Sequence, residues 1–588
     1  MPEVSTTTTV NHRRVFTHRV RHTMTQQPIQ TDTPPQRDIF QRRRVPQWFD
    51  LKKGALRIPV EIPVERPESG TARSVLFLGS LTRGLKVLAS SQLSAWIALT
   101  CLFTTLPLAY INQKVLNDPD IWWHMRAGEW ILQNHHIPHV DPFSSTTLGR
   151  PWVEYCWAFD IGAYCLVRRF DLVGIIWFQT LMRLALTAAL FTLVRSLMPQ
   201  FWRAFALTAV AVLAMVWSLP PRPGAFSVLF FLVELYVLVW ARRRANPRLL
   251  WLLPPLFLVW ANIHVEFVNG LFMLGIFCLE PLLDRFILPS PESRTPFDQF
   301  HRQLCFVGVA SFLAILVNPY GPGLLTNVLR LASDTKIYDY VIEFHAMYFR
   351  TPNDWAVLAL LMLACFALGR SRPFRPAWAV LLAWAAWMGF RSVREVWLIA
   401  ILSAVIIAKF QEQRAQSRES DQAGEPVSSL SLSLRVAVAV TVLLVLVAGA
   451  SVGALTSKAL LDKVAAAFPV GAVNYIHRNH LQGPILNDFT WGGFLIYAVP
   501  EIPPSMDGRT NVHTQDEILS AWSLWKADPG WDKRPELQSA KLVLSNHTWP
   551  LASALRNDPR FRVVYEDRTA VLFEAVPAGK SDKASATP

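Results

Sequence analysis

Long apolar segments recur between residues 91 and 456 and are separated by short polar loops. A membrane-spanning helix needs roughly 20 apolar residues, and fewer where aromatic or arginine side chains hold its ends. The pattern predicts a mainly α-helical, multi-pass protein of the inner (plasma) membrane. We expect about eleven transmembrane helices, over residues 91–111, 172–194, 201–219, 225–240, 249–262, 267–284, 303–318, 353–369, 376–390, 395–409 and 435–456.

The segments on either side of this transmembrane domain (91–456) have a different pattern. Residues 1–90 are polar and basic, which favours a largely disordered cytoplasmic N-terminal region. In residues 457–577, short apolar runs near 484–487, 541–545, 561–565 and 570–573 alternate with helix-like stretches. This alternation predicts an extracytoplasmic α/β domain, followed by a disordered tail over 578–588.

The distribution of charge supports this topology. The chain is 52% hydrophobic with a net charge of +14, and residues 1–90 contribute 15 Lys and Arg against 7 Asp and Glu. Most other basic clusters fall in loops that become cytoplasmic when the N-terminus lies inside, as membrane proteins require. Membrane lipids, and not nucleic acid, therefore explain the basic excess. Two clusters lie on the other side, namely Arg168–Arg169 and Arg391 with Arg394.

Two predicted outer loops are long, 112–171 and 319–352, and the first contains the strongest candidates for chemistry. We expect a membrane-surface helix after Asp118-Pro119, with Ile121, Met125, Gly128 and Leu132 on one face. Asp118 also suits the cap of that helix. Capping does not require a second carboxylate, Asp120, with His124 one turn later. Two acids at the mouth of a membrane cavity suit a general base for an incoming hydroxyl, or ligands for a divalent metal on a leaving phosphate.

The other cysteine and histidine clusters do not indicate a metal or disulfide framework. The six cysteines lie in or beside apolar segments without CxxC spacing. Four histidines and Asp141 fall within the first outer loop, but Pro138 and Pro142 make this a turn-rich segment without the usual zinc spacing. A zinc site is therefore disfavoured.

Several motifs together resemble those of a known superfamily. They are the acidic opening of the first loop (residues 117–124), Gly128-Glu129-Trp130-Ile131, Asp141-Pro142-Phe143-Ser144, Gly149-Arg150-Pro151-Trp152, Trp260-Ala261-Asn262-Ile263-His264, Asn318-Pro319-Tyr320-Gly321, residues 486–493 and Asp507-Gly508-Arg509-Thr510. With the predicted topology, they resemble the C-type (GT-C) glycosyltransferases, in particular bacterial relatives of protein mannosyltransferases and lipid A aminoarabinose transferases. The resemblance covers most of residues 91–575.

The resemblance implies a transferase that moves a sugar from a polyprenyl-phosphate donor to an acceptor on the extracytoplasmic face, a glycan, lipid or protein of the cell envelope. It implies that Asp118 and Asp120 act as general base or as ligands for Mg or Mn, without deciding between the two. One departure is Cys156, which stands where an acid often precedes the tryptophan. Glu154 would then have to substitute for that acid as a catalytic residue.

Other residues are candidates for substrate binding. Arg222, Arg391 and Arg394 lie at predicted outer ends of spans, where a guanidinium could bind a phosphate or simply reach the membrane interface. His124 and His264 are further candidates, although for His264 a buried hydrogen bond is the simpler role. Glu234 and Glu280 lie within spans, which makes them functional candidates or partners of a nearby arginine.

Two other function classes remain open. A non-enzymatic transporter or flippase of lipid-linked saccharides also needs many spans and charged cavity residues, but the repeated halves common in transporters are missing from the sequence. A catalytically degenerate relative is consistent with Cys156.

Overall fold

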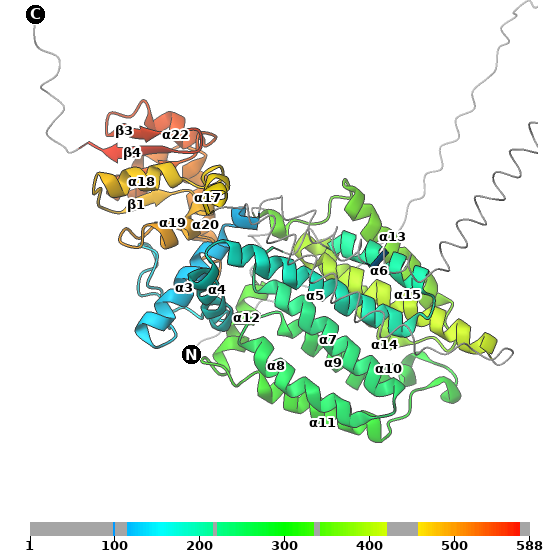
Figure 1. The fold of residues 1–588 in the computed structure, drawn as a ribbon. Coiled ribbons are helices and arrows are strands. Elements are labelled where there is room, and N and C mark those ends of the chain that lie inside the picture. The colour runs from blue at the N-terminus through cyan, green and yellow to red at the C-terminus, as the bar shows by residue number, and fades with distance from the viewer. Residues whose placement is uncertain (1–97, 100–114, 216–219, 334–340, 420–456, 577–588) are drawn as a thin grey trace, which may run out of the picture. The chain divides into compact units, whose positions relative to one another are not determined.

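The computed structural model describes residues 98–99, 115–215, 220–333, 341–419 and 457–576, with only the backbone described over 410–419 and 457–459. Within these ranges the chain is mostly helical and ends in a small sheet (Figure 1). Two predicted spans, 91–111 and 435–456, lie almost wholly outside the described residues, as do the N-terminal region and the tail.

Apolar helices occupy the positions of the other nine predicted spans, because these stretches are mostly apolar. Two of them are divided near interior prolines, at Pro254–Pro255 and at Pro281. The helices are α5 (Val173–Leu197), α6 (Phe201–Met215), α7 (Gly224–Arg243), η3 with α8 (Pro247–Leu252 and Leu253–Ala261), α9 with α10 (Phe267–Cys278 and Glu280–Ile287), α11 (Gln299–Ala314), α13 (Pro352–Gly369), α14 (Pro376–Arg391) and α15 (Val396–Glu419).

Not all of these helices are long enough to cross a bilayer. Among the described residues, α5, α7 and α13 meet the length and hydropathy expected of a span. The pair α9 and α10 adds a fourth if it forms one span bent by 55°. These helices indicate a membrane protein, whereas the number of eleven spans stays a prediction.

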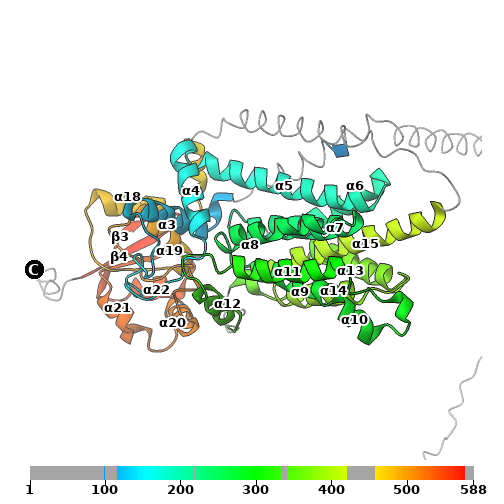
Figure 2. The same cartoon turned by 90° about the horizontal axis from the view of Figure 1, so that it is seen from below.

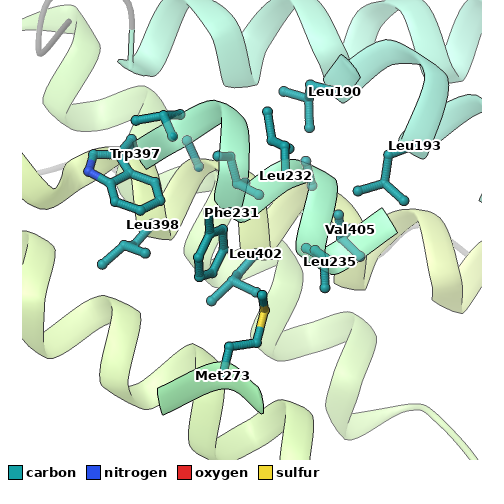
Figure 3. Close-up of a cluster of buried hydrophobic side chains, with 14 of the residues drawn as sticks. Leu190, Leu193, Phe231, Leu232, Leu235, Met273, Trp397, Leu398, Leu402 and Val405 are labelled. Atoms are coloured by element: carbon teal, nitrogen blue, oxygen red, sulfur yellow. The ribbon is translucent and has the colours of Figure 1, made fainter. Parts of the chain in front are cut away.

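A continuous apolar core joins the long helices. Figure 3 shows Leu190 and Leu193, Phe231 and Leu235, Met273, and Trp397 with Leu402 meeting between α5, α7, α9 and α15. The ring centroids of Phe231 and Trp397 are 5.2 Å apart at an edge-to-face angle of 80°, a favourable arrangement for aromatic pairs. The same helices run beside one another in both ribbon views (Figures 1 and 2).

The first long loop contains η1 (Val115–Asn117), α3 (Asp120–Asn134) and α4 (Trp157–Phe170). The second contains α12 (Gly323–Ser333) and η6 (Ile342–Phe344), and η7 (Val393–Glu395) joins α14 to α15. A one-turn helix, η4 (Pro291–Ser293), lies between α10 and α11.

The C-terminal segment folds into the predicted α/β arrangement. Its four strands are β1 (Ile485–Asn487), β2 (Leu542–Ser545), β3 (Phe561–Glu566) and β4 (Val571–Ala575), in the order β1-β2-β4-β3. Strands β1 and β2 are parallel, and the other two pairings are antiparallel. Its helices are α17 (Ser457–Ala465), α18 (Val470–Arg478), η9 (Phe489–Trp491), α19 (Gly492–Ala498), α20 (Gln515–Trp525), η10 (Trp531–Lys533), α21 (Pro535–Ser539) and α22 (Pro550–Leu555).

The C-terminal domain packs directly on α3. Trp122 meets the rings of Phe468, Phe494 and Tyr497 at centroid distances of 5.1 to 5.6 Å. Gly493 permits this contact, since a Cβ there would lie 2.3 Å from the carbonyl oxygen of Pro119. The predicted placement of α3 on the membrane surface therefore misses its main partners, which are α4 and α19.

Candidate active site

The turn at the start of α3 brings the two predicted aspartates, Asp118 and Asp120, close together. The Asp118 Oδ1 atom accepts hydrogen bonds from the backbone amides of Asp120 (2.9 Å) and Ile121 (3.2 Å), which caps the helix start as expected. The structure starts α3 at Asp120, so Asp118 acts from one residue before the cap position occupied by Pro119. Its second oxygen, Oδ2, stays available for an ionic contact.

That contact comes from Arg222, which lies in a proline-bounded turn just before α7. Its Nε is 2.8 Å from Asp118 Oδ2, and its Nη1 is 2.8 Å from Asp120 Oδ2. The same Nη1 is 2.9 Å from Glu343 Oε2, in the one-turn helix η6. We call Asp118, Asp120, Glu343 and Arg222 the acidic cluster. It joins the two long loops, 112–171 and 319–352, to the start of α7.

Arg394 lies next to the acidic cluster. Its guanidinium is 3.4 Å from Glu343 Oε1, 3.5 Å from Glu266 Oε1 and 3.4 Å from His264 Nε2. The backbone fixes this neighbourhood, because the Val393 amide donates to the His345 carbonyl at 2.9 Å. The contacts of Arg394 are longer than those of Arg222. Because they are longer, the Arg394 guanidinium is freer to bind a further anion.

Burial raises the pKa of two carboxyls in this region, those of Asp120 and Glu266. Burial, with Asp118 and Glu343 nearby, raises the pKa of Asp120 to about 7 even though Arg222 opposes the shift. Burial together with Glu395 raises the pKa of Glu266 to about 8. The pKa of Glu343 is lowered instead, since Arg222 and Arg394 both contact it and outweigh its burial.

A second polar group, the His124 cluster, lies between α3 and α4. The His124 Nδ1 atom is 2.6 Å from Asp160 Oδ1, and both side chains are buried. Glu154 is also buried, and its Oε1 accepts from the Cys156 amide at 2.9 Å. Burial raises the pKa of Asp160 well above its usual value and that of Glu154 to about 7, and it lowers the pKa of His124.

The sequence-predicted site residues therefore separate into groups. Asp118, Asp120 and Arg222 meet in the acidic cluster, while Glu154 joins His124 through Asp160 instead of reaching the two aspartates. His264 is buried and hydrogen-bonds Ser227 Oγ at 2.9 Å, the simpler of its two expected roles, but it also contacts Arg394.

Three other predictions have structural outcomes. Arg391 stacks over Trp387, with its Cζ 5.3 Å from the ring centroid, and it does not appear among the described contacts of the acidic cluster. Glu280 pairs with Arg242, as one alternative predicted. The Glu234 carboxyl is buried against α9 without a hydrogen-bond partner among the described residues.

Sequence reasoning did not select Glu343, Asp160 or Glu266 as site residues. Glu343 had a usable signal, since it is an acid in the only other long outer loop that the hydropathy pattern predicts.

An arginine balances the charge of the acidic cluster. The Arg222 guanidinium contacts all three of its carboxylates. Among the described residues, no group of three His, Cys, Asp or Glu side chains is placed to hold a metal. A Mg or Mn ion at Asp118 and Asp120 stays a prediction.

A buried ionic network attaches the C-terminal domain beside the acidic cluster. Arg509 Nη1 is 2.7 Å from Asp141 Oδ1, and its Nη2 is 2.8 Å from Asp507 Oδ2. All three side chains are fully buried. Between Asp507 and Arg509, Gly508 lies so close to Asp120 that a Cβ at this position would be 2.4 Å from Asp120 Oδ1.

Comparison with known proteins finds similarity among solved structures. No protein-family model matches the chain, and no curated protein matches its sequence. Among solved structures, the chain is similar to the Archaeoglobus fulgidus oligosaccharyltransferase, both tethered to an acceptor peptide containing the NVT sequon (TM-score 0.47) and in the apo form (TM-score 0.49). Each match has 12% identity and covers 77% of this chain and 69% of the other. At this level of similarity, the function proposed below rests on the site geometry.

Proposed function

We propose that the chain is a membrane glycosyltransferase of the GT-C type, which moves a sugar from a polyprenyl-phosphate donor to a hydroxyl or amine acceptor. The observation that carries this proposal is the acidic cluster with Arg394 beside it, at the ends of apolar helices. A buried carboxyl with a pKa near neutrality suits a general base, and a guanidinium nearby suits a phosphate.

In this mechanism Asp120 is the general base. Its ionised carboxylate accepts the proton of the acceptor group, whose oxygen or nitrogen attacks the anomeric carbon of the sugar. The bond between that carbon and the phosphate oxygen breaks, and polyprenyl phosphate leaves with the bonding electron pair. Because Arg222 is shared by three carboxylates, we assign it to orienting Asp118 and Asp120.

Arg394 is assigned to the leaving phosphate. Its contacts with Glu266 and Glu343 are 3.4 to 3.5 Å long, and 27% of its side chain is exposed. A phosphate oxyanion could replace these weaker contacts with charge-assisted hydrogen bonds. The extracytoplasmic orientation and the acceptor class come from the sequence resemblance and belong to the proposal.

The test is transfer from a radiolabelled polyprenyl-phosphate sugar in membranes that contain the full chain. Asp120→Asn is expected to lower the rate by about 10²- to 10⁴-fold, the usual contribution of a general base. Asp118→Asn is expected to lower it less, because Asp118 orients Asp120 through Arg222. Arg394→Gln is expected to raise the KM for the donor.

Glu129→Gln is the matched control, since Glu129 lies on the same helix but pairs with Arg126 outside the acidic cluster. It should retain the parental rate. Full activity in the folded Asp120→Asn variant would disprove the role of Asp120, and donor uptake without covalent transfer would favour a transporter. Loss of transfer on adding a chelator would instead assign Asp118 and Asp120 to a divalent metal.

A further inference from the structure

A group of basic side chains lies at the end of the helix bundle opposite the acidic cluster. Arg242 and Arg243 end α7, whose other end follows Arg222. The 20 residues of α7 correspond to a length of about 30 Å, the thickness of a bilayer core. Arg375 precedes α14, and Lys409 lies on α15. We call these four residues the basic recess group.

The four side chains line two adjoining recesses. The first is lined by Arg375 and Lys409 with Ser371 and apolar residues of α13 and α15. The second is lined by Arg242, Arg243 and Lys409. Trp378 and Lys409 line both, with the Lys409 Nζ 5.7 Å from the centroid of the Trp378 ring.

The acids of this region lie behind the basic residues. Glu280, which pairs with Arg242, has a side chain that is 1% exposed, whereas that of Arg242 is 34% exposed. Asp284 is fully buried and lies 3.7 Å from Arg375, whose side chain is 30% exposed. Among the residues that the structure describes with side chains, no acid lines either recess. The open side therefore presents positive charge.

The walls of the second recess are apolar and aromatic. The wall residues are Leu238 and Val239 of α7, Phe277 of α9, and Phe300 and Leu304 of α11. A basic pocket between membrane helices suits the headgroup of an anionic lipid.

The tendency of membrane proteins to place basic residues on one side accounts for basic residues near this end of the bundle. It does not require these residues to line the same recess. Two arginines in the α13–α14 connection illustrate the difference. Arg370 stacks over Phe366, and Arg372 donates to the backbone carbonyls of Gly369 and Ser371. Both are exposed, and neither lines a recess.

We propose that the basic recess group binds the phosphate headgroup of an anionic membrane lipid. Arginine forks bind phosphate oxygens bidentately, and lysine adds a point charge. This site lies at the other end of the bundle from the acidic cluster and does not depend on the proposed glycosyl transfer.

The experiment uses the purified full chain in mild detergent, with phosphatidylglycerol, phosphatidylcholine or inorganic phosphate added. Retained lipid is counted by native mass spectrometry, and the thermal midpoint is recorded. Phosphatidylglycerol should be retained and should raise the midpoint, whereas the other two additions should do neither. The double variant Arg375→Gln/Lys409→Gln should retain at least fivefold less phosphatidylglycerol.

The matched control is Arg370→Gln/Arg372→Gln, which removes the same charge at the same end of the bundle. It should retain phosphatidylglycerol as the parent does. An equal loss in both double variants would overturn the proposal, because bulk charge would then explain retention. An equal midpoint shift with inorganic phosphate would also overturn it in favour of a free anion. If the double variant does not fold, the single variant Lys409→Gln is measured in its place. It should retain less phosphatidylglycerol than the parent.

Discussion

At the scale of single residues, burial raises the pKa of Asp120, and one guanidinium shared by three carboxylates does not offset it. Arg222 contacts Asp118, Asp120 and Glu343 within 2.9 Å, so its charge is divided among them. Burial and the two neighbouring acids then prevail, and the pKa of Asp120 rises to about 7. A base with this pKa is ionised in only part of the population at neutral pH, so small changes in its surroundings change the rate.

The activity should therefore depend on pH through the charge of Asp120. Because the base acts when ionised, kcat/KM should rise with pH and level off above about 7. Replacing Glu343 by Gln removes one negative neighbour, which lowers the pKa of Asp120 and should move the rising limb to lower pH by about one unit. The measurement is kcat/KM for transfer between pH 5 and 9 in both proteins.

The control for this shift is Glu129→Gln, which removes an acid of α3 outside the acidic cluster. Its profile should overlay that of the parent. A rising limb that stays at the same pH in the Glu343→Gln variant would contradict the coupling between Glu343 and Asp120.

The sequence allowed part of the acidic cluster to be predicted. Asp118 and Asp120 are two residues apart at a helix-start signal, and Arg222 lies at a predicted outer span end. Glu343 lies 121 residues beyond Arg222, and the packing of η6 against η7 helps to place it there. Local patterns carry no information on such a contact.

At the scale of elements, the turn Asp507–Gly508–Arg509 brings the C-terminal domain onto Asp120. A Cβ at position 508 would lie 2.4 Å from Asp120 Oδ1. The Asp120 carboxyl is held by Arg222, so relief of this overlap has to move either the turn or the reacting oxygen. Position 508 therefore has no room for a side chain larger than that of glycine.

Gly508→Ala should lower kcat by tenfold or more, since displacements of about 1 Å at a reacting atom are costly. The chain should stay folded, because the surrounding ion pairs are unchanged. Gly162→Ala is the control, as a Cβ there meets nothing within 4 Å. The comparison is kcat at saturating donor together with the thermal midpoint, and an unchanged kcat in Gly508→Ala would refute the close contact.

The same turn is held by Arg509, and its loss should release the first outer loop. Arg509→Met would leave the buried carboxylates of Asp141 and Asp507 without their guanidinium, a loss of about 3 to 5 kcal/mol for a buried pair. We expect a lower thermal midpoint and faster proteolysis within residues 135–152. Arg562→Met, at a pair with the arginine 67% exposed, should change neither.

The elements themselves were predicted better than their partners. The strands and helices of the C-terminal domain lie where alternation of apolar runs indicated. For α3, the predicted apolar face was wrong at Leu132, which is 38% exposed, while Trp122 and Ile131 are buried. Periodicity assumed one covered face, but α4 and α19 cover the helix from two sides.

At the scale of the whole molecule, buried groups at the bundle end give the fold a pH-dependent stability. Burial raises the pKa of Asp120 and Glu154 to about 7 and that of Glu266 to about 8. Burial lowers the pKa of His124 and His264, which stay neutral in the fold. The histidines favour the fold as pH rises toward 6.5, whereas the carboxyls favour it at low pH.

Above pH 6.5 only the carboxyl effect remains, because histidines are then largely neutral in the folded and unfolded chain alike. The folded protein keeps protons on Asp120, Glu154 and Glu266 that the unfolded chain has already lost near pH 4 to 5. Unfolding therefore releases protons, and stability falls with rising pH by up to about 1.4 kcal/mol per group and pH unit.

The thermal midpoint in detergent should be lower at pH 8 than at pH 6.5. Glu266→Gln removes one of these groups and should flatten the decline, whereas replacement of the surface carboxyl of Glu574 by an amide should not. A midpoint that rises over this interval would mean that these carboxyls are ionised in the folded protein, and with it the assignment of Asp120 as a base of near-neutral pKa would fail.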